Sequence, residues 1–254
     1  MKKMYRISFT LLLFLITHAV NAQSVVHAES SRLKADEQGF SGNIEMGLNF
    51  VQNINNVFSS QNASQFQYVS KRHIFTSLNA LNLTIFNENR VLNDGFQHLR
   101  YGNRINKKIR WEGFVQAQYN EIIKIRGRYL TGTGPLFKIF NSEEDSVNLI
   151  YSTAYMLEYE EETTDIINRH QRWNNMLSVG WPINNKVDLD LITYYQPDIM
   201  NFKDFRISSE IMLKINIIKR LNLKYSMALF YDADPPDGIK NVFYNIKNTL
   251  SFDL

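Results

Sequence analysis

Histidine is the side chain that hydrolases most often use as a general base, and the chain of 254 residues contains only 5. Nucleophilic catalysis needs a nucleophile, a base and a group that orients the base. Beyond the first 22 residues the histidines are His27, His73, His98 and His170, none of them in a recognisable Ser-His motif. We therefore predict no catalytic residues. A lipid-modifying enzyme that uses His170, with Ser or Asn partners beside a loop, is kept as an alternative.

Two other segments invite a search for ligands. The run Glu160-Glu161-Glu162 with Asp165 could attract Ca²⁺, but it lacks the spacing of a dedicated calcium site, and we interpret it as a solvated loop. The segment Gly132-Thr133-Gly134 lacks the Lys-Ser/Thr pair and the helix of a phosphate loop, so its glycines indicate a bend or close packing in a strand. The chain has no cysteine. We predict no metal site and no cofactor.

The elements that would position these residues are strands, because apolar and polar residues alternate with period two along most of the chain. For example, Trp111, Val115 and Tyr119 fall on one side of a segment, and Glu112 and Gln116 fall on the other. The same pattern predicts about twelve strands, at approximately 42–53, 57–70, 73–88, 93–105, 109–120, 122–138, 146–160, 168–181, 187–196, 203–216, 220–231 and 240–253. Short polar turns are expected at one end of the sheet and longer loops, at 87–92, 160–167 and 232–239, at the other.

The alternation favours an antiparallel transmembrane β-barrel with apolar side chains on lipid and polar side chains in the lumen. No segment after the first 22 residues has the roughly 18 consecutive apolar residues of a transmembrane helix. A soluble β-sandwich is the competing interpretation, but strands of about 10 to 14 residues are longer than is typical of globular sheets. Aromatic residues eight positions apart on the apolar side predict a girdle at the two membrane interfaces. Its members are Trp111, Tyr119, Trp173, Trp181 and Tyr195.

Charged residues on the polar side predict a lumen charge belt near the periplasmic mouth. Its members are Glu45, Glu112, Arg126, Arg128, Asp188, Asp190, Glu210, Lys214, Lys224 and Lys247. Lys214 is expected opposite Lys224, and closure of the barrel would bring Glu45 near. One interpretation is a narrow pore, since rings of charge set selectivity in channels. The other is that the side chains pair and fill the interior, and the balanced signs favour this second interpretation.

The N-terminus predicts export. Lys2, Lys3 and Arg6 precede an apolar core at 7–16, and a small-residue cleavage site ends at Ala22. We therefore divide the chain into a signal peptide at 1–22, a periplasmic segment at 23–41 and an outer-membrane barrel at 42–254. Cleavage removes three basic residues and no acidic one, so the formal net charge of +3 falls to zero. A nucleic-acid partner is therefore not expected.

The chain resembles the YdiY-like family of salt-induced outer-membrane proteins, known as domain of unknown function 481. The matching residues are Glu29-Ser30-Ser31-Arg32, Asp36, Gly39-Phe40-Ser41-Gly42, Leu99-Arg100-Tyr101, the strand from Trp111 to Tyr119, and Arg126 to Arg128 followed by Gly132 and Gly134. The pattern looks like that of Bacteroidetes members. The resemblance covers nearly all of the chain after the signal peptide and implies a fold and a location, but no reaction.

Three functions are therefore expected, in this order. The first is a non-enzymatic structural or stress-related barrel in the Gram-negative envelope, whose partners are the lipid bilayer, the barrel-assembly machinery during insertion and other envelope proteins. The second is a narrow channel for small polar solutes or ions. The third is the lipid-modifying enzyme.

Overall fold

The structure is a computed structural model that describes residues 38–52, 56–141, 147–218 and 221–252. The predicted signal peptide and residues 23–37 of the predicted periplasmic segment lie outside the described residues, as do the predicted turn residues 142–145. Within the described ranges there is no helix with the length and hydrophobicity needed to cross a membrane.

The described residues form twelve long strands, which agrees with the number that the alternation predicts. They are β1 (Gly39–Gln52), β2 (Asn56–Val69), β3 (His73–Phe86), β4 (Asn89–Arg104), β5 (Ile109–Asn120), β6 (Ile125–Asn141), β7 (Asn148–Glu162), β8 (Ile167–Asn184), β9 (Val187–Pro197), β10 (Phe205–Ile218), β11 (Leu221–Asp232) and β12 (Val242–Phe252). Most bounds lie within a few residues of the predicted ones. The strands are long, and their side chains alternate along most of each strand between two unlike surroundings.

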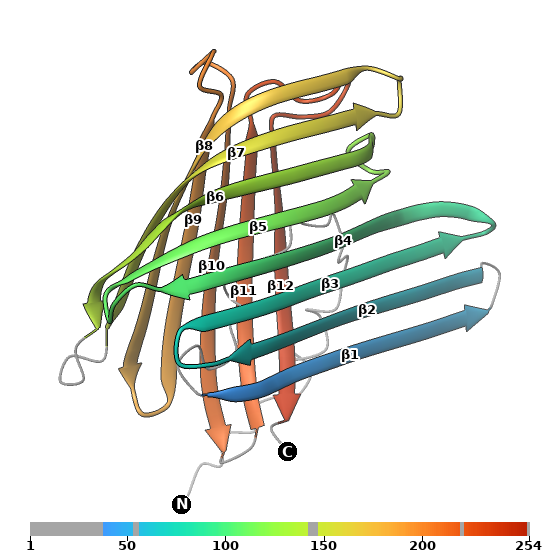
Figure 1. Cartoon of the computed structure of the whole chain (residues 1–254). Helices are drawn as coiled ribbons and strands as arrows, with labels where there is room; N and C mark the ends of the chain where they lie inside the picture. Colours follow the sequence, from blue (N-terminus) through green and yellow to red (C-terminus); the bar gives the residue numbers. More distant parts are fainter. Residues whose placement is uncertain (1–37, 53–55, 142–146, 219–220, 253–254) are drawn as a thin grey trace, which may run out of the picture.

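The strands form one antiparallel sheet in chain order, from β1 to β12. Figure 1 shows how the sheet curls, so that β1 to β6 cross in front of β9 to β12. Within the described ranges β1 and β12 are not paired with each other, and the sheet is therefore not closed. The prediction of an all-β antiparallel sheet is confirmed, whereas the closed barrel is not seen in this structure.

We call the end of the sheet where β1 begins and β12 ends the base, and the opposite end the rim. The rim connection between β3 and β4 is tighter than the predicted loop at 87–92. Asn87 and Glu88 form a two-residue turn with φ of 45° and 69°. Such a turn matches the twist of a hairpin, and asparagine tolerates positive φ better than most residues. The amide oxygen of Asn87 also accepts a hydrogen bond of 2.7 Å from the backbone N–H of Asn56.

The two faces of the sheet are inverted relative to those of a soluble protein. Apolar side chains are exposed on the outward face, among them Leu48, Val115 and Ile246. Charged and amide side chains are buried on the inward face, and the whole residues Arg172 and Glu158, backbone included, are only 1% and 4% exposed. A large apolar surface around a polar interior is what a lipid-facing sheet requires.

Two glycines of β6 allow close approach on this sheet, as the sequence predicts. A Cβ atom on Gly132 would lie 2.6 Å from the ring of Phe114, and one on Gly134 would lie 2.0 Å from the backbone oxygen of Thr153. Neither contact is sterically possible. These glycines therefore let β6 pack tightly against its neighbours.

Candidate functional site

The inward face carries a cluster of buried charges nearer the rim than the base, centred on the carboxylate of Glu158 in β7. Arg128 of β6 donates from Nε to Glu158 Oε1 at 2.6 Å. Arg172 of β8 donates from Nε to the other carboxylate oxygen, and Arg206 of β10 donates from Nη1 to Oε1. The Glu158 side chain has 0% exposure. One carboxylate therefore joins arginines from three different strands.

Glu160, two residues further along β7, completes this core. Arg206 donates to its carboxylate from Nη1 at 3.0 Å and from Nη2 at 3.1 Å. Arg206 also donates from Nε to Asp232 of β11 at 2.7 Å. We call Arg128, Glu158, Glu160, Arg172 and Arg206 the charge cluster. Because it links β6, β7, β8 and β10, it bridges the concave side of the sheet.

His170 of β8 anchors the rim connection between β9 and β10 beside this cluster. Its Nδ1–H donates to Asp198 Oδ2 at 2.6 Å, and Nδ1 lies 3.3 Å from Asp204 Oδ2. Burial raises the pKa of Asp198, but hydrogen bonds from His170 and from the backbone N–H of Met200 outweigh it, so the pKa lies below its ordinary value. Asp204 in turn accepts from Arg172 Nη1 at 3.1 Å. Two carboxylates thus hold His170, where the sequence suggested Ser or Asn partners.

The same three side chains are the described group whose ligand atoms are close enough to hold a metal ion. One ligand atom from each of His170, Asp198 and Asp204 lies within 4.8 Å of the others. The Arg172 guanidinium already forms an ion pair with Asp204, however, and its positive charge would repel a metal ion bound there. The contacts of Asp198 and Asp204 are explained by the hydrogen bond from His170 and the ion pair with Arg172, which together hold the connection at 198–204 in place.

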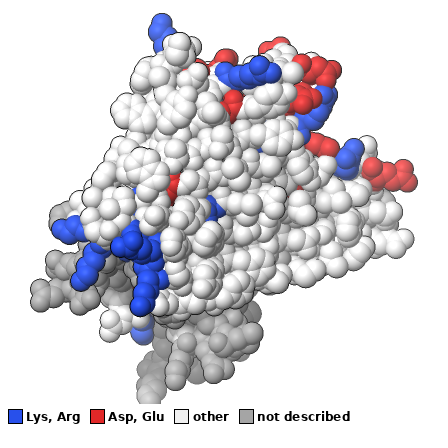
Figure 2. Space-filling view, in the orientation of Figure 1, with Lys and Arg blue, Asp and Glu red and all other residues white. Residues whose placement is uncertain are grey.

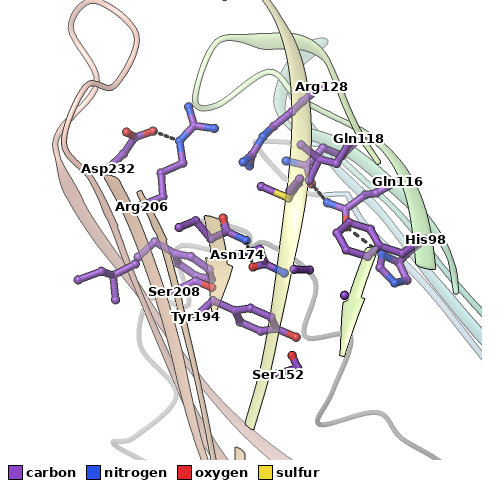
Figure 3. Close-up of a pocket in the computed structure, with 18 of the residues that line it drawn as sticks. His98, Gln116, Gln118, Arg128, Ser152, Asn174, Tyr194, Arg206, Ser208 and Asp232 are labelled. Carbon is purple, nitrogen blue, oxygen red and sulfur yellow. Dashed lines mark hydrogen bonds and ion pairs between the residues drawn. The ribbon is translucent and has the colours of Figure 1, made fainter. Parts of the chain in front are cut away.

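A cavity of about 130 Å³ lies under the charge cluster, between the inner faces of β4 to β12. Figure 3 shows Arg128 and Arg206 at one end of it and Ser152 and Tyr194 towards the other. Its wall combines amides such as Gln118 with apolar side chains such as Leu130 and Met156. The cavity is therefore a pocket with two arginines at one end and a wall of mixed polar and apolar side chains.

The described members of the predicted lumen charge belt lie at different levels of the sheet and do not form one ring. Near the base, β10 places Lys214 opposite Lys224 of β11 and Asp188 of β9. Asp190 is half-buried on β9, and Glu210 is buried on β10. On β5, Glu112 pairs with Arg110 at 2.6 Å. The prediction put Arg128 near the periplasmic mouth, but it lies in the charge cluster near the rim, close to the first residue of β6.

Two members of that belt have side chains outside the described part of the chain, and the prediction for a third member is wrong. The side chains of Glu45 and Lys247 lie outside what the structure describes. Arg126 is not in the lumen, since its side chain is 47% exposed and binds Glu161 and Asp165 at the rim. The pairing of β6 with β7 shifts by one residue between Ile125 and Gly127, and this bulge breaks the alternation that the prediction assumed.

The acidic run of β7 also differs from its prediction as a solvated loop. It belongs to the strand, and Glu160 and Glu162 are buried at 1% and 6% exposure, whereas Glu161 faces the opposite side. Sequence reasoning likewise missed Arg172, Asp198 and Asp204. Arg172 could have been found, because it alternates with the outward Trp173 along β8.

The predicted aromatic girdle residues lie on the outward face. Trp111, Trp173, Trp181 and Tyr195 are between 41% and 48% exposed. Tyr119 is partly buried, because its ring covers Gly95 and its hydroxyl donates to Asn93 at 3.1 Å. Trp111 donates from Nε1 to Thr133 at 2.8 Å, which leaves its ring facing outward with its polar group satisfied.

The base carries a groove with strongly basic walls. It is lined by Lys71, Arg72, Arg104, Asn106, Lys107, Lys108, Ile109, Arg110, Leu136 and Lys138. No acidic residue belongs to this lining. Figure 2 shows lysine and arginine side chains gathered at the lower left, while the broad face between base and rim is largely uncharged. The groove is thus a positive surface beside an apolar belt.

With the geometry established, the family can be stated. The family model "Protein of unknown function, DUF481" matches residues 44–253. The chain belongs to the DUF481 family. This DUF481 protein matches no curated protein. The predicted family is confirmed, and its assignment to the Bacteroidetes stays a prediction.

Solved structures similar to the DUF481 protein include the NanC porin, with a TM-score of 0.50 and 9% sequence identity. That match covers 77% of this chain and 94% of the porin. The translocator domain of the autotransporter NalP from Neisseria meningitidis has a TM-score of 0.42 and 8% identity, over 87% of this chain and 91% of that one. The likeness to the porin shows a shared β-barrel type of fold, and it does not transfer a function.

Proposed function

We propose that the protein is a non-enzymatic outer-membrane β-barrel with a lumen obstructed by the charge cluster. In this proposal it is exported by a signal peptide cleaved after Ala22 and has a structural, stress-related role in the Gram-negative envelope. The inverted faces of the sheet support the membrane location, because an exposed apolar belt of this extent is unfavourable in water. The resemblance to salt-induced proteins supports the stress-related role.

The proposal includes closure of the sheet between β1 and β12. A strand edge presents a row of backbone N–H and C=O groups, and each one left unpaired in hydrocarbon costs several kcal/mol. β1 and β12 are the two edge strands of the described sheet, so each has one edge that is not paired with another described strand. Pairing of these two edges satisfies both.

The observation that carries an obstructed lumen is the way Arg206 reaches Glu158 and Glu160 across the sheet. Arg206 belongs to β10 and the glutamates to β7, so these ion pairs span the concave side instead of following the strand ladder. Paired side chains of this kind fill the interior of a medium-sized barrel. A narrow channel would require this bridge to open.

Planar-bilayer recordings of the full-length mature protein test this function. The wild type is expected to show no steady conductance, whereas Arg206→Ala should conduct because the bridge across the interior is removed. Arg126→Ala is the matched control, since Arg126 makes exposed ion pairs at the rim. Steady conductance of the wild-type protein would instead support the channel for small polar solutes or ions.

The position of His170 is the reason to prefer a non-enzymatic role. A lipid-modifying enzyme needs its base and nucleophile at the lipid interface, but His170 lies on the inward side of β8, bound to Asp198. Its alternation with the outward Trp173 places its ring away from lipid. A phospholipid or lipopolysaccharide hydrolysis that is lost in His170→Ala would overturn this part of the proposal.

The basic groove at the base supports an envelope partner that carries carboxylates. In the proposed orientation the base faces the periplasm, and an acidic protein segment complements the lysines of the turns at 70–72 and 105–108. The full-length protein in nanodiscs should bind polyglutamate, and Lys107→Glu with Lys108→Glu should reduce this binding at least tenfold. Lys240→Glu at the rim is the control. Equal losses in both variants would argue against a specific basal surface.

A further inference from the structure

The cavity beneath the charge cluster contains one buried cationic group with an unused donor. Arg128 is 5% exposed, and its Nη2 atom has no hydrogen-bond partner among the described residues. The guanidinium lines the cavity, and Figure 3 shows it at the cavity's upper end. A buried N–H group without an acceptor is unfavourable, so this position favours an oxygen acceptor in the cavity.

In the other two arginines of the charge cluster, every guanidinium nitrogen has at least one hydrogen-bond partner. Arg206 uses Nε for Asp232, Nη1 for Glu158 and Glu160, and Nη2 for Glu160. Arg172 uses Nε for Glu158 and both terminal nitrogens for Asp204. Arg128 is therefore the member of the cluster that lines the cavity and has a guanidinium nitrogen without a hydrogen-bond partner among the described residues.

The orientation of that donor is set before any ligand arrives. Arg128 Nε donates to Glu158, whose carboxylate is held in place by two further arginines. A guanidinium held on one edge presents its other nitrogen in a defined direction, because the group is planar and rigid. The site is thus preorganised for an acceptor.

Gln118 supplies a second polar group next to this donor. It is the cross-strand partner of Arg128 and also lines the cavity. Its Oε1 accepts a hydrogen bond of 2.7 Å from Gln116, so its amide nitrogen is the end directed to other acceptors. Two neighbouring N–H donors match the two oxygens of a carboxylate.

The remaining lining residues determine what kind of ligand fits beside these two donors. Apolar side chains such as Phe114, Leu130 and Met156 line part of the cavity, beside polar ones such as Asn174 and Ser208. Aromatic and aliphatic walls with a few placed polar groups are typical of small-molecule pockets. A solute with an apolar body and one polar end therefore fits a lining that combines both kinds of side chain.

We propose that this cavity binds a small organic monocarboxylate, with the carboxylate on Arg128 and Gln118 and the apolar body against Leu130 and Met156. This binding site goes beyond the structural role proposed above and does not depend on whether the lumen conducts. The charge on the ligand distinguishes it from neutral solutes, since a charge-assisted hydrogen bond is stronger than a neutral one.

The test uses the full-length mature protein in detergent micelles with two matched probes, 4-fluorobenzoate and 4-fluorobenzamide, followed by fluorine NMR. The wild type should bind the acid at least tenfold more tightly than the amide. Arg128→Gln should lose at least tenfold in affinity for the acid and little for the amide. Arg126→Gln, two residues away on the same strand but exposed at the rim, should bind like the wild type.

A second variant keeps the test decisive if Arg128→Gln does not fold. Ala154 lines the cavity without contributing a charge, and Ala154→Phe should fill the space and abolish binding of both probes. Absence of acid binding to the wild type at millimolar concentration would overturn the proposal. Equal affinity for acid and amide would overturn the carboxylate assignment, and unchanged binding in Ala154→Phe would overturn the location.

Discussion

Glu158 is the residue on which most of the buried charges depend. Its carboxylate accepts hydrogen bonds from Arg128, Arg172 and Arg206 and has no exposed surface. A buried ion pair is not in itself a source of net stability, because desolvation of the charges offsets their attraction. Removing one partner is costly, however, because the opposite charges then remain buried without compensation.

Glu158→Gln should therefore lower the free energy of unfolding by about 3–5 kcal/mol, the usual cost of breaking a buried pair. Glu161→Gln on the same strand is the control and should change stability little, because its partner Arg126 is exposed. Urea titrations of both variants in the same lipid or detergent measure the difference. Similar losses for the two variants would show that the charges of the cluster are solvated.

Arg126 shows that a single inserted residue changes the face of the sheet on which a side chain lies. Arg126 and Arg128 are two positions apart and should share a face, yet the first is exposed at the rim and the second is buried. The cause is the one-residue shift between β6 and β7, which inserts Arg126 as a bulge. The regular alternation of apolar residues in the sequence contains no signal for this shift.

At the scale of the elements, each strand separates two surroundings. On β9, Leu191 lies on the outward side between Val179 of β8 and Ile211 of β10, and Asp190 lies on the inward side beside Gly180 and Met212. Adjacent residues therefore belong to different media. Strand positions and facing were predictable here because period two is a local property of the chain.

Leu191→Arg tests this assignment directly. If the side chain meets hydrocarbon near the midplane, the variant should lose about 2–4 kcal/mol of stability. Asp190→Asn is the neighbouring control, and its effect should be smaller because an amide remains acceptable in a polar interior. Unfolding titrations of both variants in lipid vesicles compare them. A larger loss at Asp190 would reverse the inside and outside faces.

At the scale of the whole molecule, the proposed closure of the barrel depends on the edges of β1 and β12. Their outward residues Leu48 and Ile246 lie at similar distances from the rim and are both well exposed. Closure in a membrane would bring such positions within reach of each other, since neighbouring strands lie about 4.7–4.9 Å apart. The chain has no cysteine, so a disulfide between two engineered cysteines can be interpreted without interference from native thiols.

Leu48→Cys combined with Ile246→Cys, or with Tyr244→Cys to allow for register, should form a disulfide in the outer membrane. Non-reducing gels measure the product, and Leu48→Cys with Val115→Cys is a control that should stay reduced, because β5 is several strands away. If neither β1–β12 pair crosslinks while the protein is membrane-embedded and heat-modifiable, the closed barrel is wrong.

The sequence by itself determined the strand number, the outward and inward faces and the family, because these depend on local alternation and short motifs. Only the tertiary structure decided which inward charges meet. Arg206 and Glu158 are 48 positions apart, and their contact depends on the curl of the sheet. The bulge at Arg126 and the hydrogen bond between His170 and Asp198 also depend on the tertiary structure. Side chains that meet across a curved sheet leave no periodic trace in the chain, since their spacing depends on sheet curvature and register and not on the alternation of any one strand.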